Sequence, residues 1–244
     1  MTAETRVTTA PVLELVDVQA NIGVSHILQG VSFTAPANAV TVVLGRNGVG
    51  KTTTLRAILG LVQRSGSIRL LGEQIEQVET SKIVRRGVAY VPEDRDVFRR
   101  LSVQENLMLA ERKNSEHRYE LVYELFGELK TRAKQAAGSM SGGQQQMLSL
   151  ARGLLNENAL MLIDEPTKGL APRVVGDVVK VLEKAREIST IVMVEQNLAV
   201  ARRLADHVVV MSEGRVVVEG ERDLLDDDHR MRQLLGLEAE GKGH

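Results

Sequence analysis

Short apolar runs alternate along the chain with segments whose apolar residues recur at helical spacing. Residues 51–61, which follow one such run, predict a helix. This alternation is typical of an α/β fold, in which crossover helices connect the strands of a sheet. The runs that predict strands are residues 13–18, 30–35, 39–44, 67–72, 87–91, 159–163, 190–194, 207–211 and 215–220.

The pattern changes between about residue 92 and residue 156. Residues 102–113 and 115–130 carry apolar side chains at helical spacing, and no strand pattern interrupts them. We therefore predict a small helical subdomain inserted into the α/β core. The predicted single domain comprises core segments 12–91 and 157–220, a helical subdomain at about 92–156, and a short C-terminal helical tail at 221–244.

Composition narrows the classes of function. Lys and Arg number 31 against 32 Asp and Glu, so the basic excess typical of nucleic-acid binders is absent, and we expect no nucleic-acid partner. The chain has no cysteine, which excludes disulfides and thiolate metal sites. Its apolar runs are far shorter than the roughly 20 residues that span a bilayer, and its first residues do not resemble a signal peptide.

The segment "GRNGVGKT" at residues 45–52 matches the pattern G-x-x-x-x-G-K-[ST] between a predicted strand and a predicted helix. Its glycines allow backbone amides to approach phosphate oxygens, and the helix N-terminus adds partial positive charge. Lys51 is expected to reach the β- and γ-phosphates, and the Thr52 hydroxyl to bind Mg²⁺. The residues predicted to bind the nucleotide here are Gly45, Arg46, Asn47, Gly48, Val49, Gly50, Lys51, Thr52 and Thr53.

The segment "LMLIDEP" at residues 160–166 is an apolar strand that ends in two acids. If this strand lies beside the phosphate loop, Asp164 can hold the magnesium ion directly or through water. Glu165 can then act as general base on an attacking water, a role that contributes about 10²- to 10⁴-fold to rate.

A third motif, "SGGQ", starts a helix with a serine and two glycines, and it forms a second candidate anion site. Together with the phosphate loop and the acidic pair, it makes the sequence resemble the ATP-binding subunit of an ABC transporter from about Leu13 to Gly236. The resemblance implies a head-to-tail dimer, in which the motif of one chain closes over the γ-phosphate bound to Lys51 of the other. The residues concerned are Ser141, Gly142, Gly143 and Gln144.

Four positions depart from the commonest family pattern. Glu93 stands where a glutamine usually contacts Mg²⁺; a carboxylate there would repel the γ-phosphate unless the metal lies between them, so Glu93 joins Thr52 and Asp164 as a predicted magnesium ligand. Gln196 stands where a histidine usually contacts the γ-phosphate, and it joins Glu165 and Lys51 as a predicted catalytic residue. The other two departures are Ala171, where aspartate is common, and Ile22, where an aromatic residue usually stacks on adenine.

The segments "VPE", "MSGGQQQML", "DEP…GLAP" and "VEQN" together resemble one of the two ATPases of branched-chain amino-acid importers and of their urea or amide relatives. The resemblance implies an ATPase with ATP and Mg²⁺ as cofactors, on the cytoplasmic face of the plasma (inner) membrane, that energises uptake of such amino acids or a related small polar solute. The implied partners are membrane-spanning permease subunits, a second ATPase chain in a homo- or heterodimer and, indirectly, a solute-binding protein.

Three alternatives remain open. An exporter ATPase of the lipid or lipopolysaccharide type shares the general motifs but usually keeps histidine at the position of Gln196. Soluble ABC-type ATPases that act on ribosomes or DNA usually carry two cassettes or a long coiled coil. A regulatory cassette that binds ATP without cleaving it would not need Glu165.

The aliphatic residue at position 22 predicts weak selection for ATP over GTP, because no aromatic ring is available there to stack on the base. We expect similar values of kcat/KM for the two nucleotides in a phosphate-release assay. A large preference for ATP would show that another contact reads the base.

Overall fold

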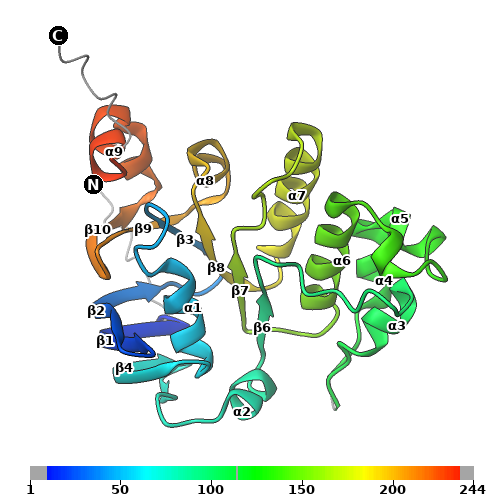
Figure 1. Ribbon diagram of the computed structural model, residues 1–244, viewed down its shortest axis with the longest axis horizontal. Coiled ribbons are helices and arrows are strands. Elements are labelled where there is room, and N and C mark those ends of the chain that lie inside the picture. Colours follow the sequence, from blue (N-terminus) through cyan, green and yellow to red (C-terminus); the bar gives the residue numbers. More distant parts are fainter. Residues whose placement is uncertain (1–9, 114, 237–244) are drawn as a thin grey trace, which may run out of the picture.

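The computed structural model describes residues 10–113 and 115–236 as an α/β structure with two sheets (Figure 1). The strands are β1 (Leu13–Ile22), β2 (Ser25–Ala35), β3 (Val40–Leu44), β4 (Gln63–Leu70), β5 (Glu73–Gln74), β6 (Val88–Val91), β7 (Leu160–Asp164), β8 (Thr190–Glu195), β9 (His207–Ser212) and β10 (Arg215–Glu221). The helices are α1 (Lys51–Leu59), α2 (Thr80–Arg85), α3 (Val103–Met108), α4 (Tyr119–Leu125), α5 (Gly127–Thr131), η1 (Ala137–Ser139), α6 (Gly142–Leu154), α7 (Pro172–Ala185), α8 (Leu198–Leu204), η2 (Arg222–Asp226) and α9 (Asp228–Leu234).

The central sheet has six strands in the order β10-β9-β3-β8-β7-β6. Strands β9, β3, β8, β7 and β6 run parallel, and β10 pairs antiparallel with β9, so the sheet is mixed. Every residue of β3, β7 and β8 is buried, which explains why these strands were visible as continuous apolar runs. The parallel arrangement brings their carboxyl ends to one edge, where the predicted phosphate loop and acidic pair begin.

Alternate residues of each central strand enter two hydrophobic cores, because successive side chains of a strand point to opposite faces. Val42 and Ile163 pack in the core that also contains Leu182 of α7. Val43 and Leu162 pack in the other core, with α1 and the N-terminal strands. The sheet therefore has α1 and the second sheet on one face and α6, α7 and α8 on the other (Figure 1).

The second sheet is antiparallel, with strand order β2-β1-β4-β5. Strands β1 and β2 are longer than predicted and meet in a hairpin whose turn contains Gly23 with φ +58°. Phe33 alternates with apolar neighbours along β2; it is 2% exposed and belongs to the core. The predicted fold class, a mixed sheet flanked by helices with an N-terminal antiparallel region, is confirmed.

The described residues between β6 and β7 form helices and loops, with no strand longer than an isolated bridge. The segment predicted to be helical at 102–113 forms α3 only to Met108, and the segment at 115–130 is divided into α4 and α5. The division falls at Phe126, whose φ of −124° and ψ of 58° are not helical. Because Val122 and Leu148 share one core with the central sheet, the boundaries of a separate helical subdomain stay a prediction.

Helices α2, α7 and α8 and the short strand β5 were not predicted. For α7 the signal was present: a proline at its first position, followed by apolar residues that recur at helical spacing and are buried in the structure. Within the described ranges, no helix is both long enough and apolar enough to cross a bilayer.

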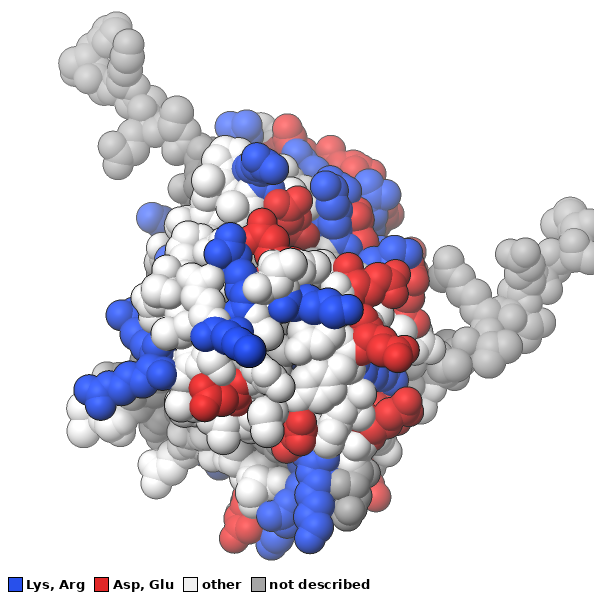
Figure 2. Space-filling model, turned by 90° about the vertical axis from the view of Figure 1, so that its right-hand side faces the viewer, with Lys and Arg blue, Asp and Glu red and all other residues white. Residues whose placement is uncertain are grey.

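Charged side chains of both signs are interspersed on the face at the α3–α5 end of the molecule (Figure 2). This face shows no continuous stripe of Lys and Arg of the kind that follows a nucleic-acid backbone. The prediction that nucleic acid is not a partner stays a prediction.

Candidate active site

The phosphate loop connects the buried end of β3 to the first turn of α1, as the motif requires. Gly50 is the N-cap of α1 and has φ +104°, a conformation that favours glycine. A Cβ atom at Gly45 would lie 2.6 Å from the carbonyl oxygen of Met211, so this position has no room for a side chain. The loop therefore curves tightly against the sheet, and its backbone lies at the N-terminus of α1.

Lys51 is 4% exposed, and its ammonium donates hydrogen bonds to the carbonyl oxygens of Gly45 (2.9 Å) and Arg46 (3.0 Å). The same Nζ lies 3.6 Å from Oε1 of Glu165. Burial lowers the pKa of Lys51, and the nearby Glu165 carboxylate opposes that shift. The predicted phosphate-binding lysine thus lies between the loop and the predicted base.

Asp164, the last residue of β7, is 1% exposed. Its Oδ1 accepts a hydrogen bond from the Thr52 hydroxyl at 3.0 Å, and its Oδ2 accepts one from the Tyr90 hydroxyl at 3.4 Å. Burial raises the pKa of Asp164 to about 6, although the bond from Thr52 works in the opposite direction. Burial, with the Asp164 charge, also raises the pKa of Tyr90 to about 12.

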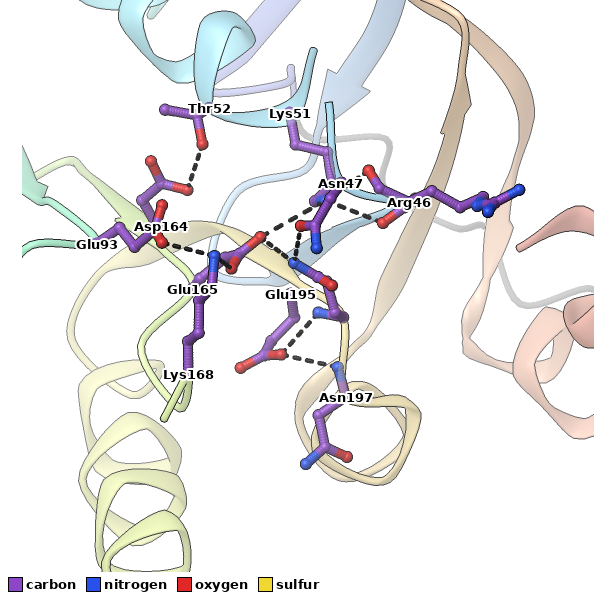
Figure 3. A network of polar contacts seen from close by, with 12 residues as sticks. Arg46, Asn47, Lys51, Thr52, Glu93, Asp164, Glu165, Lys168, Glu195 and Asn197 are labelled. Carbon is purple, nitrogen blue, oxygen red and sulfur yellow. Dashed lines mark hydrogen bonds and ion pairs between the residues drawn. The ribbon is translucent and has the colours of Figure 1, made fainter. Parts of the chain in front are cut away.

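The adjoining oxygens of Thr52 and Asp164 suit a magnesium ion, which binds to one or two protein oxygens and takes its other ligands from substrate phosphates and water. The described part of the chain contains no cluster of three or more His, Cys, Asp or Glu able to hold a metal by themselves. Glu93, the third predicted metal ligand, lies beside Asp164, but its Oε1 pairs with Lys168 (Figure 3).

Glu165 has φ +44°, the left-handed region that non-glycine residues rarely adopt. Such a backbone costs on the order of 1–3 kcal/mol, and it turns the side chain toward the phosphate loop (Figure 3). Burial works to raise the pKa of Glu165, but the ion pair with Lys168, the hydrogen bond from Gln196 and the charge of Lys51 hold that pKa below its ordinary value. The carboxylate is therefore ionised at neutral pH, as a general base requires.

Gln196 follows β8 and connects the loop to the predicted base. Its Nε2 donates a hydrogen bond to Asn47 Oδ1 at 2.6 Å and another to Glu165 Oε1. A neutral amide at this position can orient both partners without adding charge.

Glu195 was missed by the sequence analysis. Its side chain is 3% exposed, and its Oε2 accepts hydrogen bonds from the backbone amides of Gln196 (2.7 Å) and Asn197 (2.8 Å). Its Oε1 accepts one from the Thr167 hydroxyl. Glu195 thereby fixes the turn that carries Gln196, and an acid at the end of an apolar strand was the signal that could have revealed it.

Lys168 was also missed. Its Nζ lies 2.6 Å from Glu93 Oε1 and 2.8 Å from Glu165 Oε2, and both carboxylates raise the pKa of the ammonium (Figure 3). A basic residue three positions after the predicted base was the available signal.

The "SGGQ" motif lies apart from this cluster. Ser141 is the N-cap of α6: its Oγ accepts a hydrogen bond from the Gln144 backbone amide at 3.3 Å, and the Gln144 side chain accepts one from the Ser141 amide at 3.0 Å. Strands β6 and β7 lie between α6 and α1 (Figure 1). Across the described residues, no hydrogen bond or ion pair joins the motif to the phosphate loop, so one chain does not bring its two candidate anion sites together.

Residues 28–168 match the family described as ABC transporter. The chain is 41% identical over 197 residues to the high-affinity branched-chain amino acid transport ATP-binding protein BraG of Pseudomonas aeruginosa, covering 78% of this chain and 84% of that protein. It is 32% identical over 229 residues to the probable branched-chain amino acid transport ATP-binding protein LivF of Archaeoglobus fulgidus, covering 91% and 97%. The lipopolysaccharide export system ATP-binding protein LptB of Escherichia coli K12 is 30% identical over 220 residues, covering 86% and 91%.

Solved structures share this fold. A structure titled as the ATP binding subunit of an ABC transporter has a TM-score of 0.77 and 28% identity, and the match covers 92% of this chain and 95% of that one. A nucleotide-free ATP-binding cassette from an ABC transporter is 23% identical and also has a TM-score of 0.77. The match covers 90% of this chain and 97% of that one.

Replacing Asp164 with asparagine is expected to stabilise the chelator-treated, nucleotide-free protein while abolishing ATP hydrolysis. The folded-state pKa of Asp164 is raised to about 6, so ionisation of this carboxyl destabilises the folded state. The full cost is present above about pH 6, and none of it is present below about pH 4. The gain in free energy of unfolding should be about 1–3 kcal/mol at pH 8 and smaller at pH 5, measured by urea titration.

The matched control is Asp177→Asn, because Asp177 is 51% exposed and pairs with Lys180 on the surface of α7. This change should alter the free energy of unfolding by less than about 0.5 kcal/mol. A gain for Asp164→Asn that is equal at both pH values would contradict the assignment of the cost to the buried charge.

Proposed function

This chain is an ATPase of the ABC transporter family, and from that premise we propose that it energises import of branched-chain amino acids or a related small polar solute. The observation that carries the proposal is the meeting of Lys51, Asp164 and Glu165 at one edge of the sheet. The 41% identity to a branched-chain amino acid transport ATP-binding protein supports the choice of solute class.

The geometry supports hydrolysis in which the protein positions the triphosphate and activates water. The loop amides and Lys51 would hold the β- and γ-phosphates, while Thr52 and Asp164 would hold a magnesium ion that neutralises phosphate charge. The ionised Glu165 would accept the proton of the attacking water. Gln196 would keep that carboxylate and Asn47 in place.

We further propose that two chains form the complete site. The "SGGQ" helix terminus has a capping box that engages the backbone amides of Ser141 and Gln144, and it lies away from its own phosphate loop. In a head-to-tail dimer, Ser141, Gly142 and Gly143 of one subunit would cover the γ-phosphate held by Lys51 of the other. At ATP concentrations about 100-fold above Kd, each bound nucleotide adds about 2.7 kcal/mol to the closed state.

The proposed partners are membrane-spanning permease subunits, a second ATPase chain of the same or a related kind and, indirectly, a solute-binding protein. Exposed Phe98, Met108 and Leu109 give the segment around α3 an apolar surface that suits contact with a permease. The proposed location is therefore the cytoplasmic face of the plasma (inner) membrane.

Lipopolysaccharide export is the second candidate, because LptB also matches over most of its length. Its lower identity and the glutamine at position 196 favour import.

Changing Glu165 to glutamine is expected to lower kcat about 10²- to 10⁴-fold, because an amide cannot accept the water proton. ATP binding should persist, and ATP should shift the variant toward the dimer. Phosphate release and size-exclusion chromatography with and without ATP measure the two effects.

The control is Glu187→Gln, since Glu187 is exposed and pairs only with Lys184 among the residues described. That variant should keep the wild-type kcat. Unchanged hydrolysis in Glu165→Gln would remove Glu165 from the proposed role.

The import proposal predicts that the Glu165→Gln variant, captured gently from membranes with ATP, co-purifies with a permease. When that permease is reconstituted in vesicles with the wild-type ATPase, the vesicles should accumulate a labelled branched-chain amino acid only in the presence of ATP and the binding protein. Co-purification with a lipid-extracting complex instead would favour export.

A further inference from the structure

Lys168 lies between two carboxylates that come from different parts of the chain. Its Nζ is 2.6 Å from Glu93 Oε1, in the loop after β6, and 2.8 Å from Glu165 Oε2, after β7 (Figure 3). The backbone amide of Lys168 also donates a hydrogen bond to the Glu165 carbonyl at 3.1 Å, which fixes the lysine relative to the base. The lysine side chain is therefore placed to bridge Glu93 and Glu165.

The bridge offsets negative charge at the predicted triphosphate site. Three carboxylates, Glu93, Asp164 and Glu165, gather where a triphosphate with its own negative charge is to bind. Asp164 accepts hydrogen bonds from two hydroxyl groups. Glu165 forms ion pairs with Lys51 and Lys168 and accepts a hydrogen bond from Gln196. For Glu93, Lys168 supplies the one ion pair found in the described structure.

We propose that Lys168 is a positioning residue that neutralises Glu93 and holds Glu165, which allows a carboxylate at position 93 to face the γ-phosphate without repelling it. The inference rests on the proposed ATPase function. It treats Glu93 and Lys168 as one unit, so the effect of changing either residue depends on the presence of the other.

The exposure of the pair argues against a large role in folding. Lys168 is 49% exposed and Glu93 is 37% exposed, and ion pairs at such exposure contribute little to the stability of a protein. Variants at either position are therefore expected to fold. The lowered pKa of Glu165 and the raised pKa of Lys168 agree with the short contacts.

Each single change should disturb the balance of charge at the bridge. In Lys168→Ala the Glu93 carboxylate is uncompensated, which should weaken binding of ATP more than of ADP, because only ATP has the γ-phosphate. In Glu93→Gln the ammonium is left to Glu165 alone, which should reduce the capacity of that carboxylate to accept a proton. The double variant, Glu93→Gln with Lys168→Ala, removes both charges together.

The decisive measurement is the ratio of ATP to ADP affinity in EDTA, by isothermal titration calorimetry. The ratio is expected to fall about tenfold in Lys168→Ala and to return to the wild-type value in the double variant and in Lys168→Arg. Steady-state kinetics should show a lower kcat with a nearly unchanged KM in Glu93→Gln. The control is Lys82→Ala, because Lys82 is exposed and pairs with Glu79 in α2.

Equal weakening of ATP and ADP in Lys168→Ala, or single-variant effects that add in the double variant, would overturn the inference. Urea titration of each variant shows whether a loss comes from unfolding, and a folded Lys168→Ala protein with an unchanged ratio also overturns it. The binding ratio tests the bridge whether or not the protein hydrolyses ATP. A wild-type protein that releases no phosphate contradicts the proposed function instead.

Discussion

The buried ion pair between Lys51 and Glu165 is the constraint on which the rest of the site depends. The two side chains are 4% and 6% exposed, and their charged atoms lie 3.6 Å apart. A buried charge without a partner is very costly, so each group requires the other and a surrounding set of hydrogen bonds. That requirement explains why loop carbonyls, Gln196 and Lys168 all converge on these two residues.

The central sheet makes this convergence possible. Because β3, β7 and β8 are parallel and buried on both faces, their carboxyl ends lie side by side at a fixed spacing. Each strand then ends in a different chemical group: the phosphate loop, the acidic pair, or the Glu195-Gln196 turn. The close-packed cores on both faces leave these ends little freedom to move, which suits a site that must orient a triphosphate.

Part of that organisation is unfavourable to stability. Glu165 has a left-handed backbone, and Asp164 is a buried acid whose pKa is raised because its charged form is poorly solvated. Costs of this kind persist at functional sites when the surrounding structure over-determines them. Here the surrounding structure includes Glu195, whose buried carboxylate fixes the adjacent turn through two backbone amides.

The sequence alone determined the fold class and the family resemblance, and it pointed to Lys51, Asp164 and Glu165 but not to Glu195 or Lys168. Buried strands and the phosphate loop are local patterns, so apolar runs and the spacing of Gly45, Gly50 and Lys51 could be read directly. Tertiary structure decided which of these residues touch. The Lys168–Glu93 contact spans 75 positions, and the Gln196–Asn47 contact spans 149. No local pattern encodes contacts between residues so far apart in the sequence, because these contacts follow from the order of the strands and from the direction of the chain after each strand ends.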